Sequence, residues 1–193
     1  MNTLEAIAAR RSIRKFKPDP IPEAALQQIL TAATQAPSGK NRQPWRFIVV
    51  QGEQRAEMIR IMREGIARAK ANGEDPGSSE WTANVMEQAP VTVFILNPEG
   101  THPWLAHSIG QNFDDLVNIQ SIGAAIQNML LAAQDLGLGS LWICDVFYAY
   151  EALLAWLGES CQMVAAVSLG YANEAPAARQ RKPVNEVTRW MGS

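Results

Sequence analysis

The sequence contains little cysteine. Cys144 and Cys161 are the only two among its 193 residues, too few for a disulfide framework, and no C-x-x-C motif suggests a metal site. This usage is typical of a reducing compartment, so we expect a cytoplasmic protein. The sequence also lacks an apolar run of the roughly 20 residues that a membrane helix needs. Arg10 and Arg11 interrupt the apolar core that a signal peptide would require. We therefore expect neither a membrane partner nor a signal peptide.

Excess positive charge and two nucleotide-binding motifs are absent as well. The formal net charge is −2 and the sequence pI about 5.7, which argues against a general nucleic-acid surface. No G-x-G-x-x-G fingerprint follows a predicted strand, and no G-x-x-x-x-G-K-[ST] phosphate loop occurs. With 47% hydrophobic and 19% charged residues, the composition is that of an ordinary globular protein, and the length suits one domain.

One short segment departs from this mild acidity. The stretch RRSIRKFK at 10–17 holds five cations in eight residues. In an extended conformation Arg10, Ser12 and Arg14 share one face, and two guanidinium groups with a hydroxyl suit the oxygens of a phosphate monoester. The alternative is a solvated charge run, which is the usual state of such a segment. A second cation cluster, AARQRKP at 177–183, leaves the same two readings open.

Hydrophobic periodicity predicts alternating helices and strands. We expect helices at residues 3–9, 23–36, 53–71, 112–136 and 149–157, and strands at 45–50, 91–96, 140–144 and 163–171. The segments 72–84 and 97–110 lack a pattern, and the first is expected to be a mobile loop. The helix at 112–136 is apolar on almost every side, which indicates burial against a partner chain. These elements predict one α/β or α+β layered domain.

Four stretches resemble the FMN-dependent nitroreductase family. They are RRSIR at 10–14, APSGKNRQPWRFIVV at 36–50, SIGAAIQNMLLAAQDLGLGSLWI at 121–143 and RQRKP at 179–183. The resemblance extends over nearly the full chain. It implies an α+β fold of three layers (α/β/α), with a central, mostly antiparallel sheet flanked by helices. It also implies one domain over residues 1–193 and an intertwined homodimer, in which 172–193 wrap around the partner subunit.

The resemblance also implies two FMN sites at the dimer interface. Arg10, Ser12 and Arg14 would hold the phosphate, the ribityl chain and the pyrimidine edge of the flavin, with Arg11 contributing mainly through its backbone. The other cofactor-binding positions implied are Pro37, Ser38, Gly39 and Asn41 from the other subunit, Asn84 at the pyrimidine edge, Cys144 and Asp145 near flavin N5, and Arg179 and Arg181 at the phosphate.

The chemistry implied is that of an NAD(P)H oxidoreductase. NADH or NADPH gives a hydride to flavin N5, and a small-molecule acceptor, such as a nitroaromatic or a quinone, takes the electrons on the same face in a ping-pong sequence. A fixed cation such as Arg14 would stabilise negative charge on the reduced flavin. Because the flavin carries the chemistry, no catalytic acid or base is assigned. No metal is expected, since His102 and His107 lack a third ligand at a usual spacing.

Three alternatives remain open at this point. Related enzymes fragment reduced flavin with oxygen or remove halogens reductively, and a flavin-binding module without turnover would carry the same motifs. Tyr148, Tyr150 and Tyr171 lie outside 52–147, where a dehalogenase of this type would need a tyrosine, which argues against dehalogenation. Cys144 is interpreted as a packed cysteine at a strand end rather than a redox nucleophile.

Overall fold

The structure, a computed structural model, describes residues 2–192. Its helices, with two 3₁₀ turns labelled η, are α1 (Thr3–Ala9), α2 (Glu23–Thr34), η1 (Gly39–Asn41), α3 (Gln54–Ala71), α4 (Ser79–Gln88), α5 (Ile109–Asp135), η2 (Asp145–Ala149), α6 (Tyr150–Leu157) and α7 (Val184–Val187). Its strands are β1 (Arg46–Gln51), β2 (Val91–Asn97), β3 (Gly139–Ile143) and β4 (Gln162–Gly170). They form one antiparallel sheet in the order β1-β2-β4-β3.

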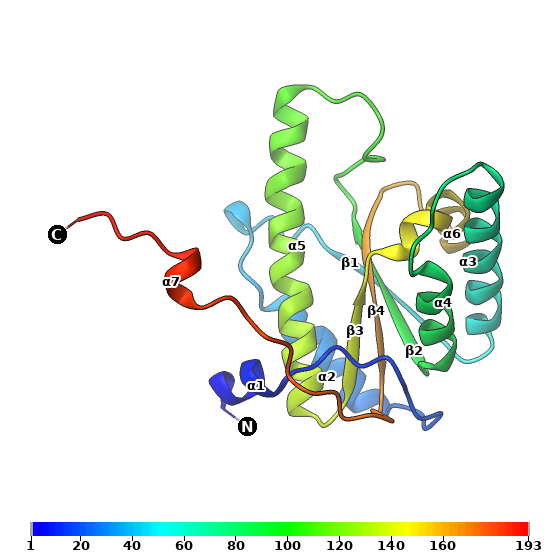
Figure 1. Cartoon of the computed structure of the whole chain (residues 1–193). Coiled ribbons are helices and arrows are strands. Elements are labelled where there is room, and N and C mark those ends of the chain that lie inside the picture. Colours follow the sequence, from blue (N-terminus) through cyan, green and yellow to red (C-terminus); the bar gives the residue numbers. More distant parts are fainter. Residues whose placement is uncertain (1, 193) are drawn as a thin grey trace.

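Helices cover both faces of this sheet, so the predicted three-layer α+β arrangement is confirmed (Figure 1). Successive side chains of a strand point to opposite faces, and β2 is buried along its whole length. Its residues Val93 and Ile95 pack in the core beneath α2 and α5, whereas Phe94 and Leu96 pack in the core beneath α3, α4 and α6. β3 lies at one edge of the sheet, and the candidate site lies around the two ends of this strand.

Most of the expected elements are confirmed within a few residues. The long helix α5 begins at Ile109, three residues before its expected start, because Ser108 forms a capping box with Gln111. The hydroxyl of Ser108 accepts the backbone N–H of Gln111 at 3.2 Å, and the side chain of Gln111 accepts the N–H of Ser108 at 2.8 Å. The helix ends before Gly137, whose φ of 73° suits a left-handed helix terminus.

The prediction of a mobile loop over 72–84 is wrong at its C-terminal end, where α4 begins at Ser79. This helix has 10 residues, fewer than three turns, so its apolar period is too short to stand out from its polar neighbours. Ala83 and Met86 are fully buried in the core that α4 shares with α3. Tertiary packing therefore stabilises a helix that the local sequence pattern does not predict.

The N-terminal half of α5 presents an apolar face that this chain leaves uncovered. Ile109 is 90% exposed, Phe113 64% and Leu116 52%, and their spacing places them on one side of the helix. Among the described helices, α5 has the length and hydropathy of a membrane span, although 44% of that window is buried within the chain. The tail after β4, including α7, projects away from the body (Figure 1). A partner chain at α5 and around the tail stays a prediction.

Candidate functional site

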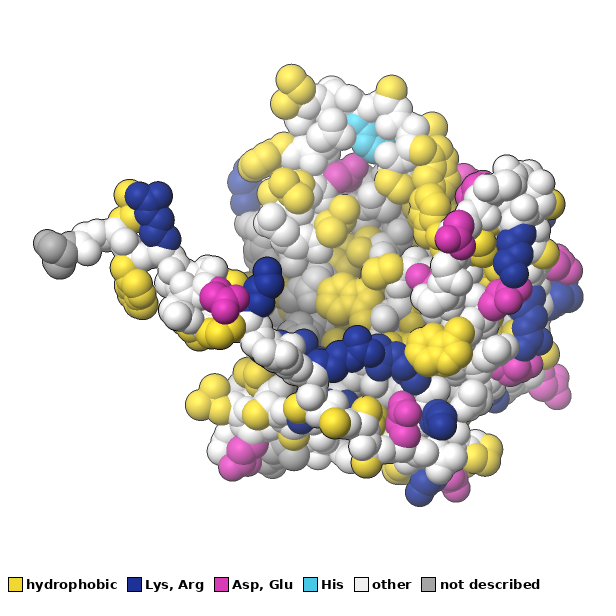
Figure 2. Space-filling model, viewed as in Figure 1, with side chains coloured by type: hydrophobic (Ala, Val, Ile, Leu, Met, Phe, Trp, Pro, Cys, Tyr) yellow, Lys and Arg dark blue, Asp and Glu magenta, His cyan; other side chains and the backbone are white. Residues whose placement is uncertain are grey.

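The two cation clusters of the sequence meet in one cleft. Six residues near the N-terminus, two of them in α1, and five of the tail line a cavity of about 520 Å³, which we call the basic cleft. The residues that carry its chemistry are Arg10, Arg11, Ser12, Arg14, Arg179 and Arg181. Figure 2 shows basic side chains gathered where these two segments cross, beside a hollow with hydrophobic side chains on its floor. The prediction that the two clusters share one site is supported by this geometry.

Backbone hydrogen bonds bring the two segments together. The N–H of Ile13 donates to the carbonyl of Ser140 on β3 at 3.0 Å, and the N–H of Asn173 donates to the carbonyl of Lys15 at 2.8 Å. The N-terminal segment therefore runs between β3 and the chain that leaves β4. Gly139 is required for this approach, because a Cβ there would lie 2.8 Å from Cγ1 of Ile13. The bridge between Ser12 and Ser140 places this segment against an edge strand, which is the extended case in which Arg10, Ser12 and Arg14 share one face.

The guanidinium groups of the cleft have no carboxylate partner in the described part of the chain, although the carboxylate of Glu174 accepts the backbone N–H groups of Arg14 and Lys15. Within residues 2–192, no carboxylate forms an ion pair with an arginine of the cleft. The guanidinium of Arg11 donates to the carbonyls of Ala8 (2.7 Å) and Arg10 (2.9 Å), and that of Arg14 donates to the carbonyl of Ser12 (3.0 Å). Burial, and then the positive charges of Arg181 and Arg11, lower the pKa of Arg10. Such uncompensated positive charge favours binding of an anion.

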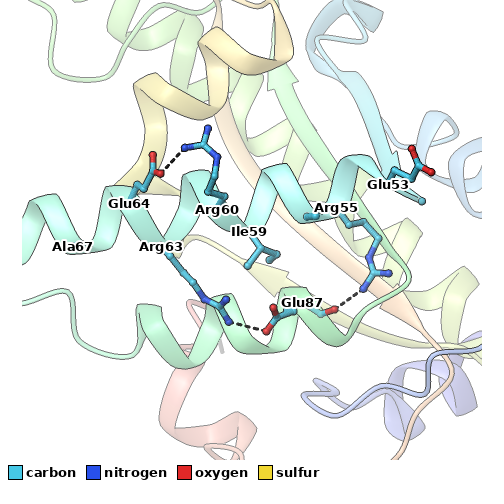
Figure 3. Close-up of a pocket in the computed structure, with 10 residues that line it drawn as sticks. Glu53, Arg55, Ile59, Arg60, Arg63, Glu64, Ala67 and Glu87 are labelled. Atoms are coloured by element: carbon cyan, nitrogen blue, oxygen red, sulfur yellow. Dashed lines mark hydrogen bonds and ion pairs between the residues drawn. The ribbon is translucent and has the colours of Figure 1, made fainter.

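A second, larger cavity provides a contrast. It has a volume of about 640 Å³ and lies along α3 beside Glu87 of α4 (Figure 3). Two of its three arginines are paired with carboxylates: Arg63 lies 2.7 Å from that of Glu87, and Arg60 forms an ion pair with Glu64. Arg55, by contrast, donates to the backbone carbonyl of Glu87. Since three glutamates balance the three arginines of the lining, this cavity has much less attraction for an anion than the basic cleft has.

The loop that contains Pro37, Ser38, Gly39 and Asn41 is strained. Lys40, Asn41 and Gln43 all have φ between 52° and 55°, a left-handed conformation that costs non-glycine residues roughly 1–3 kcal/mol each. Such clusters of strain are typical of functional segments.

The same loop is held against the N-terminal half of α5. The N–H of Gly39 donates to the hydroxyl of Ser121 at 3.3 Å, and Arg42 forms an ion pair with Asp114 at 2.9 Å. A Cβ on Gly39 would lie 2.6 Å from Val117. The loop does not line the basic cleft of its own chain, so a role for it at a flavin depends on a second subunit and stays a prediction.

Cys144 and Asp145 follow the last residue of β3. Cys144 lines a cavity of about 330 Å³, which we call the Cys144 pocket. Ser140, which pairs with Ser12 of the basic cleft, and Cys144 are four residues apart on an extended strand, a spacing of ~13 Å. Burial, and then the charge of Asp145, raise the pKa of the Cys144 thiol. A thiol with a raised pKa is a poor nucleophile, which argues against a redox role, but Cys144 is exposed, so the prediction that it is a packed cysteine is wrong.

Two further residues of α4 bear on the site. The guanidinium carbon of Arg14 lies 5.6 Å from the ring centroid of Trp81, within the range of a cation–π contact. The hydroxyl of Thr82 donates to the carboxylate of Asp145. Neither contact could be found from sequence, because α4 itself was not predicted. Asn84, by contrast, accepts a hydrogen bond from Arg63 at 3.1 Å and does not line the basic cleft.

Comparisons with known proteins agree with this architecture. The model of the Nitroreductase family matches residues 7–171. YfhC of Bacillus subtilis (strain 168), provisionally named an NAD(P)H nitroreductase, is 28% identical over 185 residues, which cover 94% of this chain and 90% of that protein. A 5,6-dimethylbenzimidazole synthase of Rhodospirillum rubrum is 32% identical over 138 residues, covering 69% of this chain and 64% of that protein.

A solved structure is similar over the whole fold. The crystal structure of a provisionally named nitroreductase from Desulfovibrio desulfuricans, in complex with FMN, is 25% identical with a TM-score of 0.76. The match covers 100% of this chain and 98% of that one. The family model, the two relatives and this fold agree with one another, and the chain belongs to the nitroreductase family.

Proposed function

We propose that this protein is an FMN-dependent NAD(P)H oxidoreductase that passes electrons to a small-molecule acceptor. The observation that carries the proposal is the basic cleft, in which arginines from both ends of the chain converge without carboxylate partners. The relatives add support, because one is named an NAD(P)H nitroreductase and a structural neighbour was crystallised with FMN.

The chemistry of the cleft fits a flavin mononucleotide. Guanidinium groups bind phosphate oxygens through paired N–H donors, and Arg10, Arg14, Arg179 and Arg181 would hold the phosphate end in this way. When bound, FMN supplies the hydride chemistry, which no side chain of the protein provides. The hydroxyl of Ser12 adds a donor in the same cleft. The ring of Trp81 would keep the guanidinium of Arg14 in place for its contact with the phosphate.

The Cys144 pocket is the proposed place for the hydride donor and the acceptor. It lies at the opposite end of β3 from the arginines, and Thr82 holds the side chain of Asp145 at its rim. Donor and acceptor would use this one pocket in turn, so we expect ping-pong kinetics. Initial rates measured against both substrates should give parallel double-reciprocal lines, and intersecting lines would contradict the single shared pocket.

We further propose that the active form is a homodimer. The uncovered apolar face of α5, the strained 37–43 loop fixed on that helix and the projecting tail all support this arrangement. In this arrangement each flavin borrows the 37–41 loop of the other subunit. Dilution that separates the subunits should therefore release FMN, measured as recovery of free flavin fluorescence. A monomer that retained its flavin would contradict the arrangement.

Fragmentation of flavin is the second candidate, because a relative at 32% identity is named a 5,6-dimethylbenzimidazole synthase. Product analysis separates the two functions. The flavoprotein is reduced, exposed to air and examined by chromatography. Intact FMN together with a reduced acceptor supports the oxidoreductase, whereas loss of the flavin ring system with appearance of a benzimidazole supports fragmentation.

The first experiment is an absorbance spectrum of the purified protein with FMN, followed by anaerobic addition of NADH or NADPH. Bleaching of the flavin band supports the proposed function. A band that persists with both donors, or a protein that fails to bind FMN, contradicts it.

A further inference from the structure

The walls of the Cys144 pocket are largely apolar. Besides Cys144, its lining includes side chains from the 97–108 segment, α5, η2 and β4. The apolar members are Pro103, Ile119, Val146, Phe147, Met163 and Val164. None of the described residues that line it carries a charge. An occupant of this pocket therefore gains free energy mainly by burying apolar surface.

The two other polar side chains of the pocket already have partners within the chain. The side-chain oxygen of Gln162 accepts a hydrogen bond from Asn97 at 3.0 Å. The hydroxyl oxygen of Tyr150 accepts the backbone N–H of Met163 at 2.8 Å. Both bonds occupy acceptor oxygens, so the pocket offers a carboxylate only neutral donors and no positive charge, and removing a charged group from water without a counter-charge is costly.

The charges that border the pocket are negative. Asp145 lies between two lining residues, and its carboxylate accepts from Thr82. Glu151 follows Tyr150 and lies 2.8 Å from His102. No arginine of the basic cleft lines this pocket, so none of them is in place to pair with an anion inside it. A carboxylate on an acceptor would therefore be repelled rather than bound.

Two of the lining residues, Phe147 and Tyr150, are aromatic, and both also line a neighbouring cavity together with Trp104. Trp104 lies edge-to-face with Tyr150 (4.6 Å between centroids) and with Phe147 (5.9 Å). Phe147 remains 55% exposed, so its ring offers surface to an incoming molecule. Flat aromatic molecules stack on such surfaces, and a volume of about 330 Å³ suits one or two rings.

We propose that the Cys144 pocket selects uncharged acceptors of one or two aromatic rings and rejects the same rings bearing a carboxylate. The proposal rests on the proposed oxidoreductase function, and it assigns Phe147 as a specificity-determining residue. In the assay reaction, one NAD(P)H and one proton supply the two electrons and two protons that convert an aromatic nitro group to a nitroso group and water.

The test compares 4-nitrobenzamide with 4-nitrobenzoate, which have nearly the same shape and differ in charge. For the FMN-loaded enzyme, kcat/KM is measured for each and divided by its rate with dithionite-reduced free FMN, which removes the difference in intrinsic reactivity. The dissociation constants for the oxidised holoenzyme are measured by calorimetry. We expect the amide to be favoured at least 10-fold in both quantities. Equal values, or a preference for the carboxylate, overturn the proposal.

Charge substitution at the exposed Phe147 makes the test sharper. Phe147→Arg places a cation at the mouth and should shift the amide-to-carboxylate ratio at least 10-fold toward the carboxylate, whereas Phe147→Leu should preserve the preference for the amide. An unchanged ratio in Phe147→Arg overturns the role of this residue. Failure of NAD(P)H to bleach the flavin would contradict the oxidoreductase itself. Normal bleaching with no charge preference contradicts only the selectivity.

Discussion

Removal of two arginines from the basic cleft is the most direct test of the phosphate site. In the double variant Arg10→Ala/Arg14→Ala, FMN loses two charge-assisted contacts, each contributing about 1.5–3 kcal/mol. Both side chains are only partly buried, so the lower end of this range applies. A total of about 3 kcal/mol corresponds to a dissociation constant about 100-fold higher. The assay is a titration of the apoprotein with FMN, in which binding is measured as quenching of the flavin fluorescence.

Riboflavin lacks the phosphate, so titration with riboflavin distinguishes the loss of a phosphate contact from a general loss of flavin binding. The wild type should bind FMN far more tightly than riboflavin, and the double variant should lose this difference while its affinity for riboflavin changes little. Removal of Arg10 should cost the apoprotein little stability, since burial and the neighbouring Arg181 lower the pKa of Arg10 in the folded state, so the charged side chain is unfavourable there. Removal of Arg14 gives up its contact with Trp81 and its hydrogen bond to the carbonyl of Ser12.

Arg60→Ala is the matched control. Arg60 is an arginine of α3 that lies between two glutamates and does not line the cleft. Its removal should leave the FMN affinity unchanged. A double variant that retains wild-type affinity, or an equal loss in the control, refutes the assignment of the cleft to the phosphate.

Three other substitutions test the surroundings of the site. Gly39→Ala places a Cβ 2.6 Å from Val117 and should reduce the free energy of unfolding by about 1–3 kcal/mol in urea denaturation; unchanged stability would show that the loop yields freely. Asp145→Asn removes the charge that helps to raise the pKa of Cys144, so alkylation of the thiol should reach its half-maximal rate at a lower pH than in the wild type, and a midpoint that stays or rises contradicts that cause. Ser79→Ala removes a buried hydroxyl that has no hydrogen-bond partner and should raise stability by about 1 kcal/mol, whereas a fall in the melting temperature would reveal a partner for that hydroxyl.

The sequence predicts the parts of the site that depend on local pattern. The extended face of Arg10, Ser12 and Arg14, the four strands and the long helix could be predicted, because charge clusters and apolar periods are local signals. The cation–π contact of Arg14 with Trp81 could not, since it depends on how α4 packs against α3. The left-handed residues of the 37–43 loop were also missed, because such conformations are imposed by tertiary contacts rather than by residue type.

The hydrogen bonds that align the two cationic segments have a consequence for the order of events during synthesis. Arg10 and Arg14 leave the ribosome among the first residues, but the segment that completes their cleft, including Arg179 and Arg181, follows more than 160 residues later. At about 5–20 residues per second, the early arginines wait roughly 10–30 s for their partners. Cofactor capture is thereby delayed until the sheet has been made, and a nascent chain released before residue 176 carries only half of the cleft.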